Sequence, residues 1–218
     1  MVAVSALFLR SLSMRFLALP LGAVALMFYI INVLIANAFP ARSAEAPSFH
    51  QEVECLAITM YWEGERGNDA DQAAIAQNVL NRTLHSAYGN SVCEVINQAK
   101  LVNGRTVYQY SFMGDNRPHP ATQMPSHHWV FSQFLAEQIL RDWYSNGRRN
   151  KQVFAEVRWQ VAHSTHYHTP AVQPLWSTVD VENCRLKPLG QIGAHLHYAE
   201  YAKADPIGHR LCRLALQK

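Results

Sequence analysis

The sequence lacks the features that mark several common classes of protein. It has no block rich in lysine and arginine and no glycine-rich phosphate loop, and its formal net charge is only +3. These absences argue against a nucleic-acid partner. It also lacks an HExxH helix, paired CxxC spacing and a Gly-x-Ser-x-Gly elbow, the usual signals of zinc sites and serine hydrolases. We therefore expect no cofactor and no bound nucleic acid.

Charge is also missing from one long segment near the N-terminus. Residues 16–39 carry no charged side chain over about 24 positions, enough for a helix to cross the hydrocarbon core of a membrane. The preceding residues 1–15 include Arg10 and Arg15 and no acid. Because positive charge stays on the cytoplasmic side, this pattern predicts a single-pass signal anchor in the inner membrane with the rest of the chain outside the cytoplasm.

A cleaved signal peptide is the alternative to an anchor. Small residues at 36–38 and at 44–46 resemble cleavage sites, and cleavage at either would secrete the protein. Residues 40–50 are small and polar and are predicted to form a linker. In both cases residues 51–218 form the exported domain, on the periplasmic or extracellular side.

The few cysteines fit an exported domain. The chain has four, Cys55, Cys93, Cys184 and Cys212. An even number of cysteines outside the cytoplasm is typical of disulfide bonding. Of the three possible pairings we prefer Cys55–Cys93 with Cys184–Cys212.

Periodicity in the exported part predicts mainly helices. Residues 51–62 are apolar nearly all round, which indicates a buried helix. Further helices are predicted at 70–85, at 92–99, after the capping residue Ser126, and from Pro206. Residues 101–123 look irregular, whereas 162–168 and 191–198 resemble short strands that could pair antiparallel. The predicted fold class is α+β, mainly helical, with a small element of two or three strands.

Glu63 ends the predicted buried helix. Val53, Leu56, Met60 and Glu63 fall along one stripe at helical spacing. Apolar neighbours disfavour a charged carboxylate, so they would raise the pKa of Glu63 and suit it to act as a general acid. The alternative is a helix-terminal glutamate that reaches solvent. Glu65 would then be paired with Arg66 or solvated in the turn.

Four histidines occupy the two predicted strands, His166 and His168 in one and His195 and His197 in the other. If the strands pair, the four imidazoles could gather as a zinc or copper site. No carboxylate or cysteine stands at ligand spacing beside them. We therefore favour histidines that line a polar groove, with no bound metal.

Seven short motifs occur in an order that resembles a known family: CLAITMYWEGERG, AIAQNVLNR, SVCEVINQ, YQYSFMGDN, HSTHYHTPAV, PLW and IGAHLHY. From about residue 54 to residue 198 the chain resembles the SleB/CwlJ-like cell wall hydrolases, the spore cortex-lytic type. The resemblance implies a lysozyme-like helical domain with a small β element. It implies that peptidoglycan glycan strands are the substrate.

The resemblance also implies the catalytic residue. Counting back from Asn81 and Arg82 without a gap places the family's catalytic glutamate on Glu63. The following Gly-Glu-Arg-Gly displaces the family's Arg-Gly by one position, which leaves Glu65 as a rival. Cysteines that often flank the family's aromatic segment are replaced here by Tyr108 and Gly114.

The chemistry implied is cleavage between N-acetylmuramic acid and N-acetylglucosamine, by hydrolysis or by lytic transglycosylation. Transglycosylation needs one carboxylate and an ordinary glycosidase needs two. We favour transglycosylation because the sequence offers no convincing second carboxylate. The alternatives are a metal-dependent wall hydrolase using the four histidines, or a wall-binding module without activity. Candidate substrate-binding residues are Tyr61, Phe112, Tyr167, His168, Trp176 and His195.

Overall fold

The structure is a computed structural model and describes residues 46–64, 68–115, 117–122, 126–145 and 151–217. Ala46–Lys218 form one compact unit, which contains the whole described hydrophobic core. The predicted cytoplasmic segment 1–15 and anchor 16–39 lie outside the described residues, as do Glu65 and Arg66. Among the helices of the described ranges, none has the length and apolar character to cross a membrane.

Three helices build the core: α2 (Phe49–Glu63), α3 (Asp69–Thr83) and α6 (His127–Ser145). Ser48 and Gln51 form a capping box that starts α2 two residues before the predicted helix, inside the predicted linker. Residues 71–83 of α3 are all buried, because other elements surround this helix. The core includes Leu56, Met60, Val79, Leu80, Leu135, Ile139 and Trp143.

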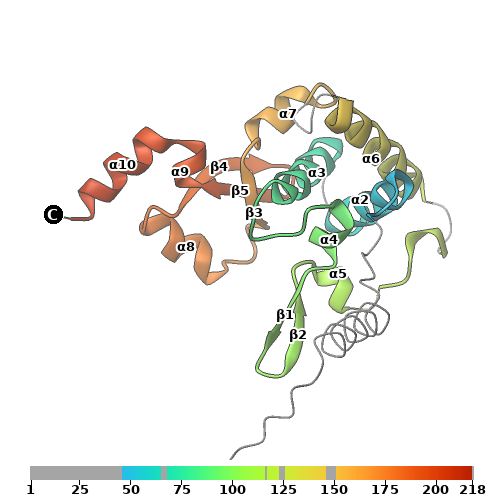
Figure 1. The fold of residues 1–218 in the computed structure, drawn as a ribbon, viewed down its shortest axis with the longest axis horizontal. Coiled ribbons are helices and arrows are strands. Elements are labelled where there is room, and N and C mark those ends of the chain that lie inside the picture. The colour runs from blue at the N-terminus through green and yellow to red at the C-terminus, as the bar shows by residue number, and fades with distance from the viewer. Residues whose placement is uncertain (1–45, 65–67, 116, 123–125, 146–150, 218) are drawn as a thin grey trace, which may run out of the picture. The chain divides into compact units, whose positions relative to one another are not determined.

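The remaining helices are short, and the last three of them lie at the sheet, away from the three core helices (Figure 1). They are α4 (Val92–Ile96), α5 (Ser111–Gly114), the 3-10 turn η1 (Pro120–Thr122), α7 (Ala155–Gln160), α8 (Leu175–Glu182), α9 (Tyr201–Ala204) and α10 (Pro206–Ala215). The expected helical tail from Pro206 is therefore confirmed. The mainly helical fold class with small antiparallel sheets is confirmed too, while the likeness to lysozyme stays a prediction.

A three-stranded antiparallel sheet packs beside α3. Its strands are β3 (Ser164–His168), β4 (Leu186–Ile192) and β5 (His195–Glu200), in the order β3-β5-β4. The predicted antiparallel pairing of the two histidine-bearing segments is confirmed by the β3–β5 ladder. The single strand predicted at 191–198 is wrong, because the chain turns between β4 and β5.

Gly193 explains that turn. Its φ is +55°, a conformation that favours glycine. A Cβ at this position would also lie only 2.4 Å from Cβ of Asp71 on α3. The glycine therefore lets the β4–β5 turn approach the beginning of α3.

A second, two-stranded sheet lies in the region predicted to be irregular. β1 (Ala99–Val102) and β2 (Arg105–Tyr108) form a hairpin that extends away from the helices (Figure 1). Asn103 and Gly104 both have positive φ, +50° and +76°, as a two-residue type I′ turn requires. The expectation of an irregular segment from 101 is thus wrong over this hairpin.

The two disulfides are Cys55–Cys93 and Cys184–Cys212, so the preferred pairing is confirmed. The first connects α2 to α4. The second connects the turn after α8 to α10, which secures the C-terminal helix to the sheet region.

Candidate active site

Glu63 is the last residue of α2, and its carboxyl group reaches the sheet. The hydroxyl of Tyr167, in the middle of β3, donates a hydrogen bond of 3.2 Å to Oε2 of Glu63. Burial raises the pKa of Glu63 above its ordinary value. This effect outweighs the lowering by the Tyr167 hydrogen bond and by the nearby charges of His195, Arg117 and Arg82.

The side chain of Glu63 lines a cleft of about 210 Å³ between α2, the loop after α5 and the sheet. The lining residues are Trp62, Glu63, Ser111, Arg117, Thr169, Ala194 and His195. The guanidinium of Arg117 lies 4.8 Å from the ring centre of Trp62, so a cation and an aromatic face share one wall. Among the described residues that line the cleft, Glu63 is the only carboxylic acid.

His195 is held in the cleft by a buried carboxylate. Its Nδ1 lies 2.9 Å from Oδ1 and 3.1 Å from Oδ2 of Asp71. A carboxylate accepts hydrogen bonds and does not donate them, so Nδ1 carries the proton and Nε2 remains for other partners. The ring of Tyr167 packs edge-on against His195 with 5.1 Å between ring centres. Asp71, His195, Tyr167 and Glu63 thus form one continuous group.

The strand register separates the four histidines that could have gathered around a metal. In the β3–β5 ladder His166 lies opposite Tyr198, and Tyr167 lies opposite His197. Because alternate residues of a strand face opposite sides, His166 and His168 lie on one face of the sheet and His195 and His197 on the other. Over the described residues, no three His, Cys, Asp or Glu side chains are arranged to hold a metal ion. The metal-site alternative is therefore not supported.

Two predicted substrate-binding residues, Tyr167 and His195, lie beside Glu63, but the other four do not join them. His168 and Trp176 pack together on the opposite face of the sheet, with 5.4 Å between ring centres. Phe112 is 5% exposed and belongs to the hydrophobic core. Tyr61 packs edge-on against Trp129, 5.9 Å between ring centres, at the edge of that core.

The structure adds residues that sequence reasoning did not select for the site. Trp62 has the simplest signal, since it is the immediate neighbour of Glu63. Arg82 donates to the hydroxyl of Tyr110 (3.0 Å) and to the carbonyl of Thr165 (2.9 Å), which fixes the backbone two residues before Tyr167. Asp71 has no sequence signal, because its partner His195 is 124 positions away.

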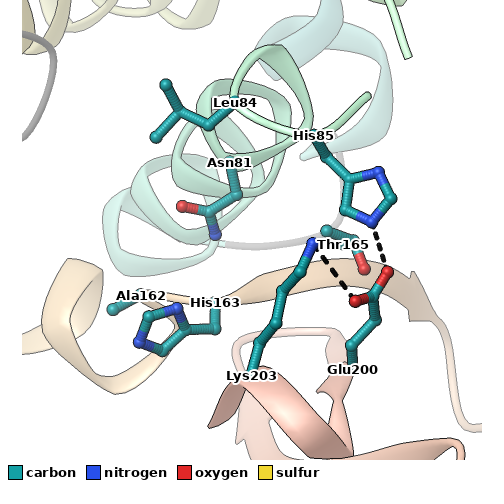
Figure 2. A pocket seen from close by; sticks show the side chains of 8 residues that line it. All are labelled: Asn81, Leu84, His85, Ala162, His163, Thr165, Glu200 and Lys203. Atoms are coloured by element: carbon teal, nitrogen blue, oxygen red, sulfur yellow. Dashed lines mark hydrogen bonds and ion pairs between the residues drawn. The ribbon is translucent and has the colours of Figure 1, made fainter. Parts of the chain in front are cut away.

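A second pocket lies at the opposite ends of α3 and β5 from the Asp71–His195 pair. Figure 2 shows three of its polar side chains turned toward one another: His85 and Lys203 both contact the carboxylate of Glu200. Burial raises the pKa of Glu200, but the hydrogen bonds from His85 and Lys203 outweigh it and bring the pKa below its ordinary value. Glu200 is thus poorly suited to donate a proton, in contrast to Glu63.

Comparison with known proteins assigns the chain to a family. The profile of the cell wall hydrolase family matches residues 66–198, which include Asp71, Tyr167 and His195 and begin after Glu63. A comparison with curated proteins found no match. Among solved structures, the crystal structure of the catalytic domain of the Bacillus cereus SleB protein is 16% identical with a TM-score of 0.42, and the match covers 70% of this chain and 92% of that chain.

The family match defines an enzyme that acts on the cell wall. This chain belongs to the cell wall hydrolase family. The resemblance of its motifs to that family is therefore confirmed.

Proposed function

We propose that this protein is a lytic transglycosylase that cuts peptidoglycan glycan strands between N-acetylmuramic acid and N-acetylglucosamine, with Glu63 as its acid and base. The observation that carries the proposal is the environment of Glu63. Its carboxyl group lines a cleft, its pKa is raised by burial, and no other carboxyl group of the described residues lines that cleft. A single carboxyl supports transglycosylation better than the ordinary two-carboxylate scheme.

In the first step the protonated carboxyl group of Glu63 donates its proton to the glycosidic oxygen as the bond from that oxygen to the muramic C1 breaks. In the second step the Glu63 carboxylate accepts the proton of the muramic 6-hydroxyl while O6 bonds to C1. The products are a 1,6-anhydromuramic end and a free N-acetylglucosamine end. Water is not consumed, and Glu63 returns to its protonated form.

The Asp71–His195 pair has a distinct role in this proposal. With Nδ1–H donated to Asp71, Nε2 of His195 can accept a hydrogen bond from a sugar hydroxyl in the cleft. Trp62 and Arg117 supply a flat apolar face and hydrogen-bond donors on the opposing wall. Asp71 is a positioning residue, because it touches His195 and lies fully buried behind it.

The exported location predicted from residues 1–39 is part of the same proposal. The two disulfides support a site of action outside the cytoplasm, since such bonds form and persist in oxidising compartments. We therefore propose that the domain works at the outer side of the inner membrane, where its polymeric substrate lies. The single-pass anchor in that membrane belongs to this proposal.

The test is mass spectrometry of the fragments that residues 46–218 release from purified sacculi. Wild type is compared with Glu63→Gln, which keeps the shape of the side chain and removes its acidic proton. Glu137→Gln is the matched control, because Glu137 forms an exposed pair with Arg141 on α6. We expect anhydro-muropeptides from wild type and from Glu137→Gln, and none from Glu63→Gln.

Other outcomes would contradict specific parts of the proposal. Reducing-end products would mean hydrolysis with a water nucleophile and a second carboxyl group. Full activity of Glu63→Gln would show that Glu63 is not the acid and base. Glu65 would then be the candidate. Binding to sacculi without any released fragment, with folding intact, would indicate a wall-binding module.

A further inference from the structure

The last described helix, α10, carries an apolar stripe that faces solvent. Ile207, Leu211 and Leu214 are spaced four and three residues apart, so they lie on one side of the helix. Their exposed fractions are 77%, 63% and 53%. Large apolar side chains in a contiguous exposed patch commonly mark an interaction surface.

The helix is held in place on its other side, so the stripe has a fixed direction. The Asp205 carboxylate accepts from the backbone N–H of Gly208 at 2.8 Å and caps the first turn. The Cys184–Cys212 disulfide joins the middle of α10 to the turn after α8. The ring of His209 lies 5.9 Å from that of Tyr201. These contacts hold the face of α10 that is turned toward the sheet region, so the apolar stripe on the other face points to solvent.

Positive charge lies on one side of the stripe. Arg210, which is exposed, lies directly beside the apolar residues, and Arg213, also exposed, lies one position further round the same side of the helix. The nearby acids are paired with other bases: Asp205 with Lys187 at 2.8 Å, and Asp180 with Arg185 at 3.3 Å. An apolar face bordered by arginines is the pattern of helices that lie in the interface of an anionic membrane.

We propose that α10 binds the surface of an anionic lipid bilayer, with Ile207, Leu211 and Leu214 inserted between headgroups and Arg210 and Arg213 on lipid phosphates. A second copy of the chain fits less well, because pairing two such faces would bring like-charged arginines together. A glycan strand also fits less well, since aliphatic side chains offer its hydroxyl groups no hydrogen bonds. Residues 206–215 lie outside the family match, and no residue of α10 lines the cleft that contains Glu63.

The experiment measures co-sedimentation of residues 46–218 with vesicles. This unit contains the described core and both disulfides, so it can be tested without the apolar segment 16–39. Vesicles of phosphatidylcholine with phosphatidylglycerol are compared with vesicles of phosphatidylcholine alone. We expect binding to the anionic vesicles that weakens as salt is added.

Two sets of variants separate the apolar and charged contributions. Ile207→Ser with Leu211→Ser and Leu214→Ser should lower the partition coefficient by about tenfold or more. Arg210→Gln and Arg213→Gln should each lower it by about fivefold on anionic vesicles only. Leu101→Ser with Val107→Ser, in the exposed β1–β2 hairpin, is the matched control and should bind as wild type does.

The thermal midpoint measured by circular dichroism checks that every variant is folded, independently of any activity on sacculi. The proposal is overturned if wild type does not bind anionic vesicles, or if the triple serine variant binds as well as wild type. It is also overturned if sedimentation equilibrium shows that wild type is a dimer and the triple serine variant a monomer, while wild type does not bind vesicles. Failure of wall cleavage with normal vesicle binding would refute the proposed function and leave this inference standing.

Discussion

Nδ1 of His195 lies 2.9 Å from Oδ1 of Asp71, and both side chains are buried at the edge of the cleft that contains Glu63. Asp71 stands in the first turn of α3 and His195 begins β5, so the contact joins the helical core to the sheet. The same imidazole packs against Tyr167, which donates a hydrogen bond to Glu63. The candidate acid, its hydrogen-bond donor and a fixed imidazole therefore belong to one rigid group.

Asp71→Asn should reduce kcat for fragment release by about tenfold to a hundredfold, because the neutral amide can turn its NH2 group toward Nδ1 of His195 and so favour the tautomer with the proton on Nε2. The thermal midpoint should change little, since the side chain keeps its shape. Asp69→Asn, in the same first turn but exposed, is the control. Nitrogen NMR of the His195 ring would show the changed tautomer directly. Wild-type kcat in Asp71→Asn would contradict the positioning role.

Tyr167→Phe should shift the pH profile of the enzyme upward. The Tyr167 hydrogen bond lowers the pKa of Glu63, so its loss raises that pKa further. Glu63 then stays protonated to higher pH, and the fall of kcat/KM on the alkaline side moves in the same direction. Tyr198→Phe is the control, because the Tyr198 hydroxyl contacts His168 on the opposite face. A downward shift in Tyr167→Phe would contradict this relationship.

His197 should make the folded state sensitive to acid. Burial lowers the pKa of His197 to about 3, and its Nε2 has no hydrogen-bond partner among the residues that the structure describes. An unfolded histidine takes up its proton near pH 6.5, so the unfolded state binds more protons as pH falls from about 6.5 towards 3. The free energy of unfolding should then decrease by up to about 1.4 kcal/mol per pH unit from this residue.

The measurement is urea unfolding at pH 7, 6 and 5 for wild type and His197→Phe. The variant should lose less stability than wild type over this range, because phenylalanine cannot be protonated. A residual slope is expected from His166, whose pKa burial lowers to about 4. Equal slopes for both proteins would show that His197 is protonated as readily in the folded state as in the unfolded one.

Arg158→Met should destabilise the domain by about 3–5 kcal/mol. The buried guanidinium donates to Asp142 at 2.6 Å and to Gln77 at 2.9 Å, so it joins α7 to α6 and α3. Its removal leaves the Asp142 carboxylate buried without its cationic partner. The same substitution at Arg141, in the exposed pair with Glu137, should cost less than about 1 kcal/mol. Similar urea midpoints for the two variants would refute the importance of the buried pair.

The sequence predicted the long helices well because their signals are local. The apolar spacing of α2 and the cap at Asn68 lie within a few residues of the features they determine. The capping box at Ser48 is equally local, but the prediction placed it in the linker and so began α2 two residues late. The apolar stripe that ends at Glu63 predicted a raised pKa, and burial in the structure raises it. The assignment of Glu63 as the catalytic residue stays a prediction.

The β1–β2 hairpin was missed although Asn103-Gly104 is a strong turn signal. All residues of both strands are exposed, so they show no alternation between an apolar and a polar face. Without that alternation, the strands cannot be distinguished by pattern from an irregular loop.

By itself the sequence determined the long helices, the family and the position of Glu63 at a helix end, because each depends on neighbours along the chain. Only the tertiary structure decided which side chains meet that carboxyl group. The register of β3 on β5 places Tyr167 on the same face as His195, and it turns His168 to the other face, where Trp176 of α8 packs against it. A shift of β3 by one residue would exchange the faces of Tyr167 and His168, and such a register depends on contacts between distant segments that no local pattern records.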